Sequence, residues 1–109
     1  MEKRFFRRVN VNGGMCTLIK DGIYTGTVGN ISLGGLFVTS DMQLTVMDRT
    51  AISITLPSDS RTIDIETDVI ATRVEKNGIA FKYDRLNPKD FWTLQSFIQG
   101  SNPPLDTYR

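Results

Sequence analysis

Three arginines near the start of the chain have the side chains and the spacing to hold a small anion. Arg4, Arg7 and Arg8 lie within five residues. A guanidinium can donate two parallel hydrogen bonds to phosphate oxygens, stack flat on a nucleobase, and pair with the O6 and N7 edge of guanine. A short basic run taken alone is more often a solvated terminus than a binding site. The arginines therefore need support from a second motif.

A second polar stretch lies between residues 30 and 35, where one predicted strand ends and the next begins. Asn30 offers an amide donor and acceptor, and Ser32 offers a hydroxyl. Gly34 and Gly35 permit a positive φ and let a ligand approach the backbone closely. Backbone N–H groups in such a turn can form an anion-binding nest. The alternative is a plain strand–turn–strand connection.

The charge distribution favours a compact anionic ligand. The net charge is +1, but residues 1–8 carry +3 and the other 101 residues carry −2. A long nucleic acid is usually bound by positive charge spread over a whole face. A basic arm ahead of a slightly acidic body therefore predicts a small anion and no long nucleic acid.

The composition favours a binding module over an enzyme. The chain has 109 residues, enough for one domain with its own core. It has no histidine and one cysteine, which excludes serine–histidine triads, His-containing zinc sites, thiolate clusters and an internal disulfide. We expect no catalytic residue, no metal and no cofactor. The charged N-terminus and the short apolar runs predict a cytoplasmic protein without membrane insertion.

Short strands separated by turns must position these residues. Alternating apolar residues and turn dipeptides such as Asn77-Gly78 are typical of an antiparallel β-protein. The apolar positions change parity along the longest run, which predicts a bulge near residues 69–71. The predicted strands cover residues 14–20, 23–31, 35–39, 50–56, 62–75 and 78–83.

One helix is predicted after the last strand. Asn87 suits the N-cap and Pro88 the first helical position, and Gly100 is a fitting stop. Apolar residues recur at helical spacing, so this face should pack on the strands and close one end of the β-structure. The helix residues that we assign to the hydrophobic core are Phe91, Trp92, Leu94, Phe97 and Ile98. Cys16, in an apolar strand, is expected to be a small buried hydrophobe.

The two polar motifs together resemble a known family. Arg-x-x-x-Arg (Arg4 and Arg8) followed by Asn-x-Ser-x-x-Gly (Asn30, Ser32 and Gly35), at the head of a small all-β chain, is similar to the PilZ domain family. Members of that family are bacterial receptors for cyclic di-GMP. The likeness extends through the Ser-Leu-Gly-Gly-Leu run, the Gly-Ile-Ala-Phe stretch and the closing helix.

The resemblance implies a fold and a role for each motif residue. The fold would be all-β, a six-stranded antiparallel barrel with one C-terminal α-helix. Arg4 and Arg8 would grip phosphates and guanines, with Arg7 adding contacts. Asn30 would hydrogen-bond the ligand, although it stands where many members have Asp. The rest of the second motif would complete the ligand site: Ser32 would bind a phosphate or guanine, and Gly34 and Gly35 would keep the surface clear.

The sequence thus predicts a cyclic di-GMP receptor that is not an enzyme. We expect a basic arm at residues 1–13, a barrel with its helix at 14–100 and a mobile tail at 101–109. Ligand would order the arm over the barrel, and the chain would signal in trans to an unidentified effector protein. A small-barrel oligonucleotide-binding protein is the alternative.

A carboxylate-based hydrolase is a weaker alternative. Asp64, Glu66 and Asp68 alternate along one predicted strand, so their carboxylates share one face. Such a row could hold a metal or do acid–base chemistry. A solvated strand face is the simpler interpretation, because no nucleophile or phosphate loop accompanies the three acids.

Overall fold

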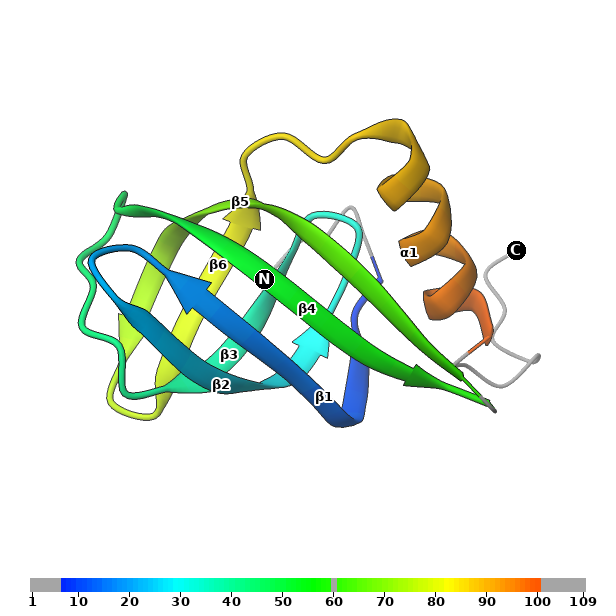
Figure 1. Cartoon of the computed structure of the whole chain (residues 1–109), viewed down its shortest axis with the longest axis horizontal. Coiled ribbons are helices and arrows are strands. Elements are labelled where there is room, and N and C mark those ends of the chain that lie inside the picture. Colours follow the sequence, from blue (N-terminus) through cyan, green and yellow to red (C-terminus); the bar gives the residue numbers. More distant parts are fainter. Residues whose placement is uncertain (1–6, 60, 101–109) are drawn as a thin grey trace, which may run out of the picture.

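The chain folds into a closed antiparallel β-barrel with one helix. The computed structural model describes residues 7–59 and 61–100. The strands close in the order β1-β2-β3-β6-β5-β4, and every neighbouring pair is antiparallel (Figure 1). The predicted fold class, a six-stranded antiparallel barrel with one C-terminal helix, is confirmed. The elements are β1 (Val9–Ile19), β2 (Ile23–Ile31), β3 (Gly35–Ser40), β4 (Arg49–Ser58), β5 (Arg61–Glu75), β6 (Gly78–Tyr83) and α1 (Pro88–Gly100).

Alternation of buried and exposed residues, clearest in β4, fills the barrel interior. In β4, Ile52, Ile54 and Leu56 are buried, while Ser53 and Thr55 between them face outward and are partly exposed. Burying one aliphatic side chain contributes roughly 1.5–3 kcal/mol, so this shared interior is the main stabilising feature. The largest fully buried side chains are Leu18, Val28, Ile31, Leu36, Val38, Ile52, Ile54, Leu56, Ile65, Val69 and Leu94.

The first strand begins earlier than the sequence predicts. Val9 is 5% exposed and Val11 is 9% exposed, and Val9 pairs with Ile31 of β2. Residues 9–13, assigned above to the arm, therefore belong to the barrel. Gly13 has φ of 85°, a left-handed conformation that favours glycine, and the register shifts there between Asn10 and Gly14. The rest of the arm up to residue 6, and the predicted tail at 101–109, lie outside the described residues.

The long strand β5 carries the predicted irregularity slightly later than expected. Its register with β6 shifts between Ala71 and Arg73. Its pairing with β4 ends at Ile70, and the residues just before β4 bond to Ala71, so beyond Ala71 β5 has a neighbour on one side only. This is why Val74 is 42% exposed although it is apolar. A two-residue turn then joins β5 to β6, immediately before Gly78.

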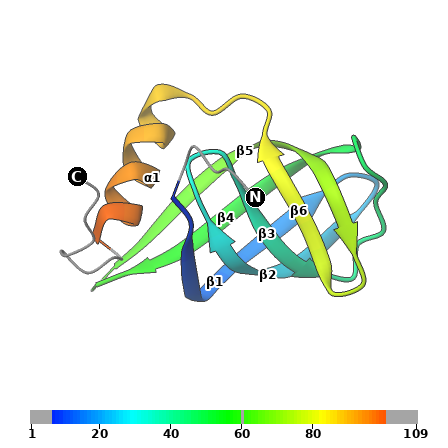
Figure 2. The ribbon, with the colours of Figure 1, turned by 180° about the vertical axis from the view of Figure 1, so that it is seen from behind.

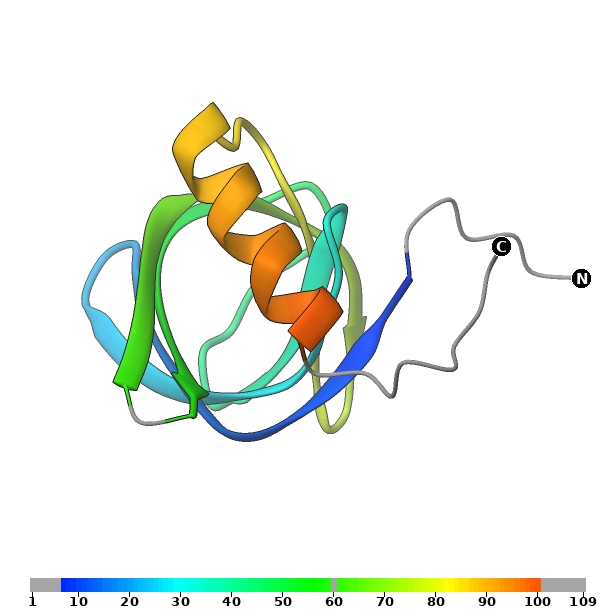
Figure 3. The same cartoon turned by 90° about the vertical axis from the view of Figure 1, so that its right-hand side faces the viewer.

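Helix α1 begins as predicted and closes one end of the barrel. The Asn87 side chain accepts a hydrogen bond from the Asp90 backbone N–H at 2.8 Å and donates one to the Asp90 carboxylate at 3.0 Å. This reciprocal contact satisfies a free N–H of the first turn. Leu94, Phe97 and Ile98 are buried in the barrel core. Figure 3 shows the helix lying across the open end of the barrel.

Two helical residues predicted for the core lie outside it: Phe91 is only half-buried and Trp92 is exposed. Trp92 is 65% exposed, and its ring meets Phe91 edge to face, with ring centroids 6.4 Å apart and planes at 86°. Successive helical residues lie about 100° apart. The face centred on Leu94 and Ile98 therefore points Trp92 away from the barrel.

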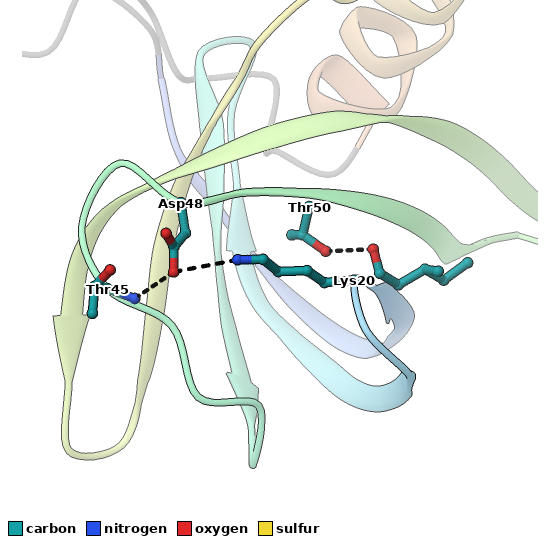
Figure 4. A network of polar contacts seen from close by, with 5 residues as sticks. Lys20, Thr45, Asp48 and Thr50 are labelled. Carbon is teal, nitrogen blue, oxygen red and sulfur yellow. Dashed lines mark hydrogen bonds and ion pairs between the residues drawn. The ribbon is translucent and has the colours of Figure 1, made fainter.

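A polar network ties the loop between β3 and β4 to the barrel end opposite α1 (Figure 4). The Asp48 carboxylate accepts a hydrogen bond from the Thr45 backbone N–H at 2.9 Å and lies 3.6 Å from the Lys20 ammonium. The Thr45 N–H, helped by Lys20, holds the pKa of Asp48 below its usual range. The Thr50 hydroxyl donates to the Ile19 carbonyl oxygen at 2.9 Å. This end of the barrel is thus held by local polar contacts.

Cys16 is a buried hydrophobe, as predicted. It is 4% exposed, and burial raises the pKa of its thiol to about 11. The thiol therefore stays protonated at neutral pH and is unreactive in the folded chain. Of the residues described, none belongs to a helix long and apolar enough to cross a membrane.

Candidate ligand-binding site

The two motifs meet where β1 begins and β2 ends. The Arg8 guanidinium donates a hydrogen bond from Nη1 to the Asn30 side-chain oxygen at 2.6 Å. The β1–β2 ladder explains this contact: Asn10 pairs directly with Asn30, so Arg8 is its diagonal neighbour on the same face. Arg8 is exposed and Asn30 is half-buried. Figure 2 shows the start of β1 beside the end of β2.

Ser32 organises the loop that follows Asn30. Its side chain is buried, at 4% exposure. The hydroxyl oxygen accepts from the backbone N–H groups of Gly34 at 3.1 Å and Gly35 at 3.2 Å, and it lies 3.3 Å from the Gly35 carbonyl oxygen, to which it donates. The Ser32 backbone N–H also donates to the Gly35 carbonyl at 2.8 Å. The loop is therefore folded around the Ser32 side chain.

These contacts correct two expectations about the loop. The N–H groups of Ser32, Gly34 and Gly35 are bonded inside the loop, so these three donors do not form an open anion-binding nest. Among the described residues, the only glycine with a positive φ is Gly13. Gly34 and Gly35 are therefore not needed for a left-handed backbone conformation.

Gly35 is required by a neighbouring strand. A Cβ at this position would lie 2.0 Å from the Phe81 carbonyl oxygen and 3.1 Å from the Lys82 Cα. Gly35 pairs with Lys82 in the β3–β6 ladder. A side chain would therefore push β3 and β6 apart at the first residue of β3.

The last residue of β6, Tyr83, is a site residue that the sequence did not single out. Its hydroxyl donates to the Ser32 carbonyl oxygen at 3.1 Å, and its backbone N–H donates to the Gly34 carbonyl oxygen at 3.2 Å. In the sequence, Tyr83 is one of several alternating apolar residues, and nothing in that pattern distinguishes it from its neighbours.

The structure describes most of the predicted site residues, but not all of them. Arg8, Asn30, Ser32, Gly34 and Gly35 lie together at the junction of β1, β2, β3 and β6. Arg7 is described and half-buried, directly before Arg8. The other motif arginine, Arg4, lies outside the described residues.

Comparison with known proteins identifies the family of the chain. The family model for the PilZ domain matches residues 2–100. The chain belongs to the PilZ domain family. No curated protein matches the chain.

Solved structures share the fold of this PilZ domain at low sequence identity. The Bacillus subtilis inhibitor of motility MotI/DgrA has a TM-score of 0.76 and 20% identity over 91% of this chain and 51% of its own. This chain thus spans about half the length of MotI. The PilZ domain of YcgR from Escherichia coli, solved with c-di-GMP, has a TM-score of 0.74 and 15% identity over 98% of this chain and 100% of its own.

A third similar structure is the PilZ domain of CeSA from a cellulose-synthesizing bacterium. Its TM-score is 0.64, with 15% identity over 86% of this chain and 96% of its own.

The acidic row of the PilZ domain lies on the outside of the barrel. Asp64, Glu66 and Asp68 are exposed on β5, and Asp64 accepts a hydrogen bond from the Thr55 hydroxyl at 2.9 Å. Glu66 and Asp68 line a shallow cleft of about 410 Å³ together with Arg85. Within residues 7–59 and 61–100, no group of three metal-ligating side chains is close enough to hold a metal ion.

Replacing Ser32 by alanine should destabilise the PilZ domain by about 1–3 kcal/mol, because the N–H groups of Gly34 and Gly35 lose their acceptor inside the protein. Urea unfolding measures this change. Ser96→Ala, exposed on α1, is the matched control and should change stability by less than about 0.5 kcal/mol. Equal stability of the two variants would contradict the role of Ser32 in the loop.

Proposed function

We propose that this PilZ domain is a receptor for cyclic di-GMP and acts by binding rather than by catalysis. One observation carries the proposal: the hydrogen bond from Arg8 to Asn30 brings the two motifs into one site. Membership of the PilZ domain family supports it. The YcgR PilZ domain, which shares the fold, was solved with c-di-GMP.

The chemistry of the site matches this ligand. Cyclic di-GMP carries two phosphate charges and two guanines. Arg4, Arg7 and Arg8 would provide charge, stacking planes and donors for the guanine edge. Asn30 would hydrogen-bond the ligand beside Arg8. Because the Ser32 hydroxyl is committed to the loop, we propose that Ser32, together with Gly34 and Gly35, shapes the site.

Calorimetric titration of the chain tests this function. Cyclic di-GMP should bind, whereas GTP and a short single-stranded oligonucleotide should give no saturable signal at the same concentrations. Binding of the oligonucleotide with no response to cyclic di-GMP would favour the alternative oligonucleotide-binding barrel. A failure of all three ligands would refute nucleotide binding by this site.

We further propose that the bound ligand fixes the segment before β1 and so creates a surface for an effector protein. The ligand would bridge Arg4 and Arg7 to the site at Arg8 and Asn30. Val9 and Asn10 are already paired with β2. Amide exchange should therefore slow on ligand addition at residues 4–8 and change little at Val9. Equal protection of residues 4–8 with and without ligand would mean a preformed site.

Asn30→Asp should bind cyclic di-GMP as tightly as the wild type or more tightly. The substitution turns the contact with Arg8 into an ion pair, which holds Arg8 in place, and it adds an acceptor charge for guanine N–H donors. An exposed pair contributes only about 0.2–1 kcal/mol, so the gain should stay below roughly fivefold. Titration of both proteins measures it. Clearly weaker binding would place Asn30 beside a ligand phosphate.

A further inference from the structure

Tyr83 lies against the loop of the proposed site from the side of the barrel wall. Two of its groups contact this loop: the hydroxyl donates to the Ser32 carbonyl oxygen at 3.1 Å, and the backbone N–H donates to the Gly34 carbonyl oxygen at 3.2 Å. The ring is partly buried against the core. The loop is thus fastened to the end of β6 at two carbonyl groups.

These two contacts add an anchor on β6 to the hydrogen bonds made within the loop. The Ser32 hydroxyl holds the N–H groups of Gly34 and Gly35, whereas Tyr83 holds the carbonyl groups of Ser32 and Gly34. Rotation of the Ser32 peptide would break the contact with the Tyr83 hydroxyl. The position of that hydroxyl therefore restrains the loop that follows Ile31, next to Asn30.

The charge of Arg8, from the first motif, also acts on the phenol of Tyr83. Burial raises the pKa of its phenol above the usual value, and the positive charge of Arg8 acts in the opposite direction. Arg8 itself hydrogen-bonds Asn30. The phenol therefore lies near the point where both motifs meet, although it belongs to neither of them.

We propose that Tyr83 is a positioning residue of the ligand site, whose hydroxyl fixes the Ser32 carbonyl and so holds the loop of residues 32–35 in place beside Arg8 and Asn30, where the ligand would bind. This inference rests on the proposed function. It concerns the hydroxyl and not the ring, because only the hydroxyl reaches Ser32. The residue would act without touching the ligand.

Tyr83→Phe is the direct test, because it keeps the ring and removes the hydroxyl. The affinity for cyclic di-GMP should fall about three- to tenfold, the value of one neutral hydrogen bond. The matched control is Thr67→Val, which removes a hydroxyl that donates to the Arg85 carbonyl oxygen at 3.0 Å, away from the loop. Both variants should lower the melting temperature by a few degrees, but only Tyr83→Phe should lose affinity.

Amide exchange provides a readout that a general loss of stability would not move. In Tyr83→Phe, the amides of Gly34 and Gly35 should exchange faster than in Thr67→Val at equal melting temperature. Unchanged affinity in Tyr83→Phe, or equal exchange in the two variants, would overturn the inference. If the wild-type chain itself binds no cyclic di-GMP, the proposed function fails, and exchange still decides whether Tyr83 holds the loop.

Discussion

Arg8→Ala should weaken the binding of cyclic di-GMP by roughly 10- to 100-fold. A hydrogen bond that involves a charged group contributes about 1.5–3 kcal/mol, and each 1.4 kcal/mol corresponds to a factor of ten. Arg8 would lose its contacts with the ligand, and Asn30 would lose the donor that now holds its side chain. The folded state should be little affected, because Arg8 is exposed. Calorimetric titration and thermal unfolding of the same preparation measure both effects.

Arg73→Ala is the matched control for this substitution. Arg73 is also an exposed arginine, but it lies on β5 and pairs with Glu75, beyond the part of β5 that contacts β4. The two variants have the same net charge. If both lose affinity equally, the effect of Arg8 is one of overall charge, and Arg8 is not a specific ligand residue.

Gly35→Ala should destabilise the barrel by about 3 kcal/mol or more, at or above the upper end of the range for overpacked sites. The added methyl would lie 2.0 Å from the Phe81 carbonyl oxygen, and a backbone group in a closed ladder cannot turn aside. For a domain of this size the melting temperature should fall by roughly 12 °C or more. Ligand binding should fail as well, because the loop of the site ends at the displaced residue.

Gly29→Ala tests whether the loss of stability in Gly35→Ala comes from the close contacts at position 35 and not from the loss of a glycine as such. A Cβ at Gly29 would meet Phe37 atoms at an ordinary 3.7 Å, and Gly29 directly precedes Asn30. This variant should be as stable as the wild type or slightly more stable. A Gly35→Ala protein as stable as Gly29→Ala would show that β3 and β6 are not held at this close distance.

The strands were predictable because alternation and turns are local properties of the sequence. Ile52, Ile54 and Leu56 alternate with polar residues, and the structure buries that set. The start of β1 was harder, since Val9 and Val11 are separated from the main run by a left-handed Gly13. Trp92 was assigned wrongly because helical spacing marks an apolar face but does not fix its width. Only the curvature of the barrel decides which residues α1 buries.

The site was predictable as a pair of motifs but not in its internal contacts. The types of Arg8 and Asn30 indicate ligand chemistry, and the pairing of β1 with β2 brings them together. The need for Gly35 and the anchoring of the Ser32 carbonyl depend on β6, about 50 residues further along the chain. A pattern of neighbouring residues contains no information on such a distant strand. Tyr83 therefore emerged only from the folded chain.

The pairing register of the β1–β2 hairpin determines which residues of the two motifs lie side by side. Arg8 and Asn30 are 22 positions apart in the sequence, yet they are diagonal neighbours because both strands run to the same turn and back. β1 has two more residues than β2 between the turn and the motifs, and the register shift between Asn10 and Gly14 absorbs this difference. Without such a shift, one residue inserted in a strand turns every side chain beyond it to the other face. A single residue inserted within β1 or β2, outside the turn, should therefore separate Arg8 from Asn30 unless a further bulge absorbs it.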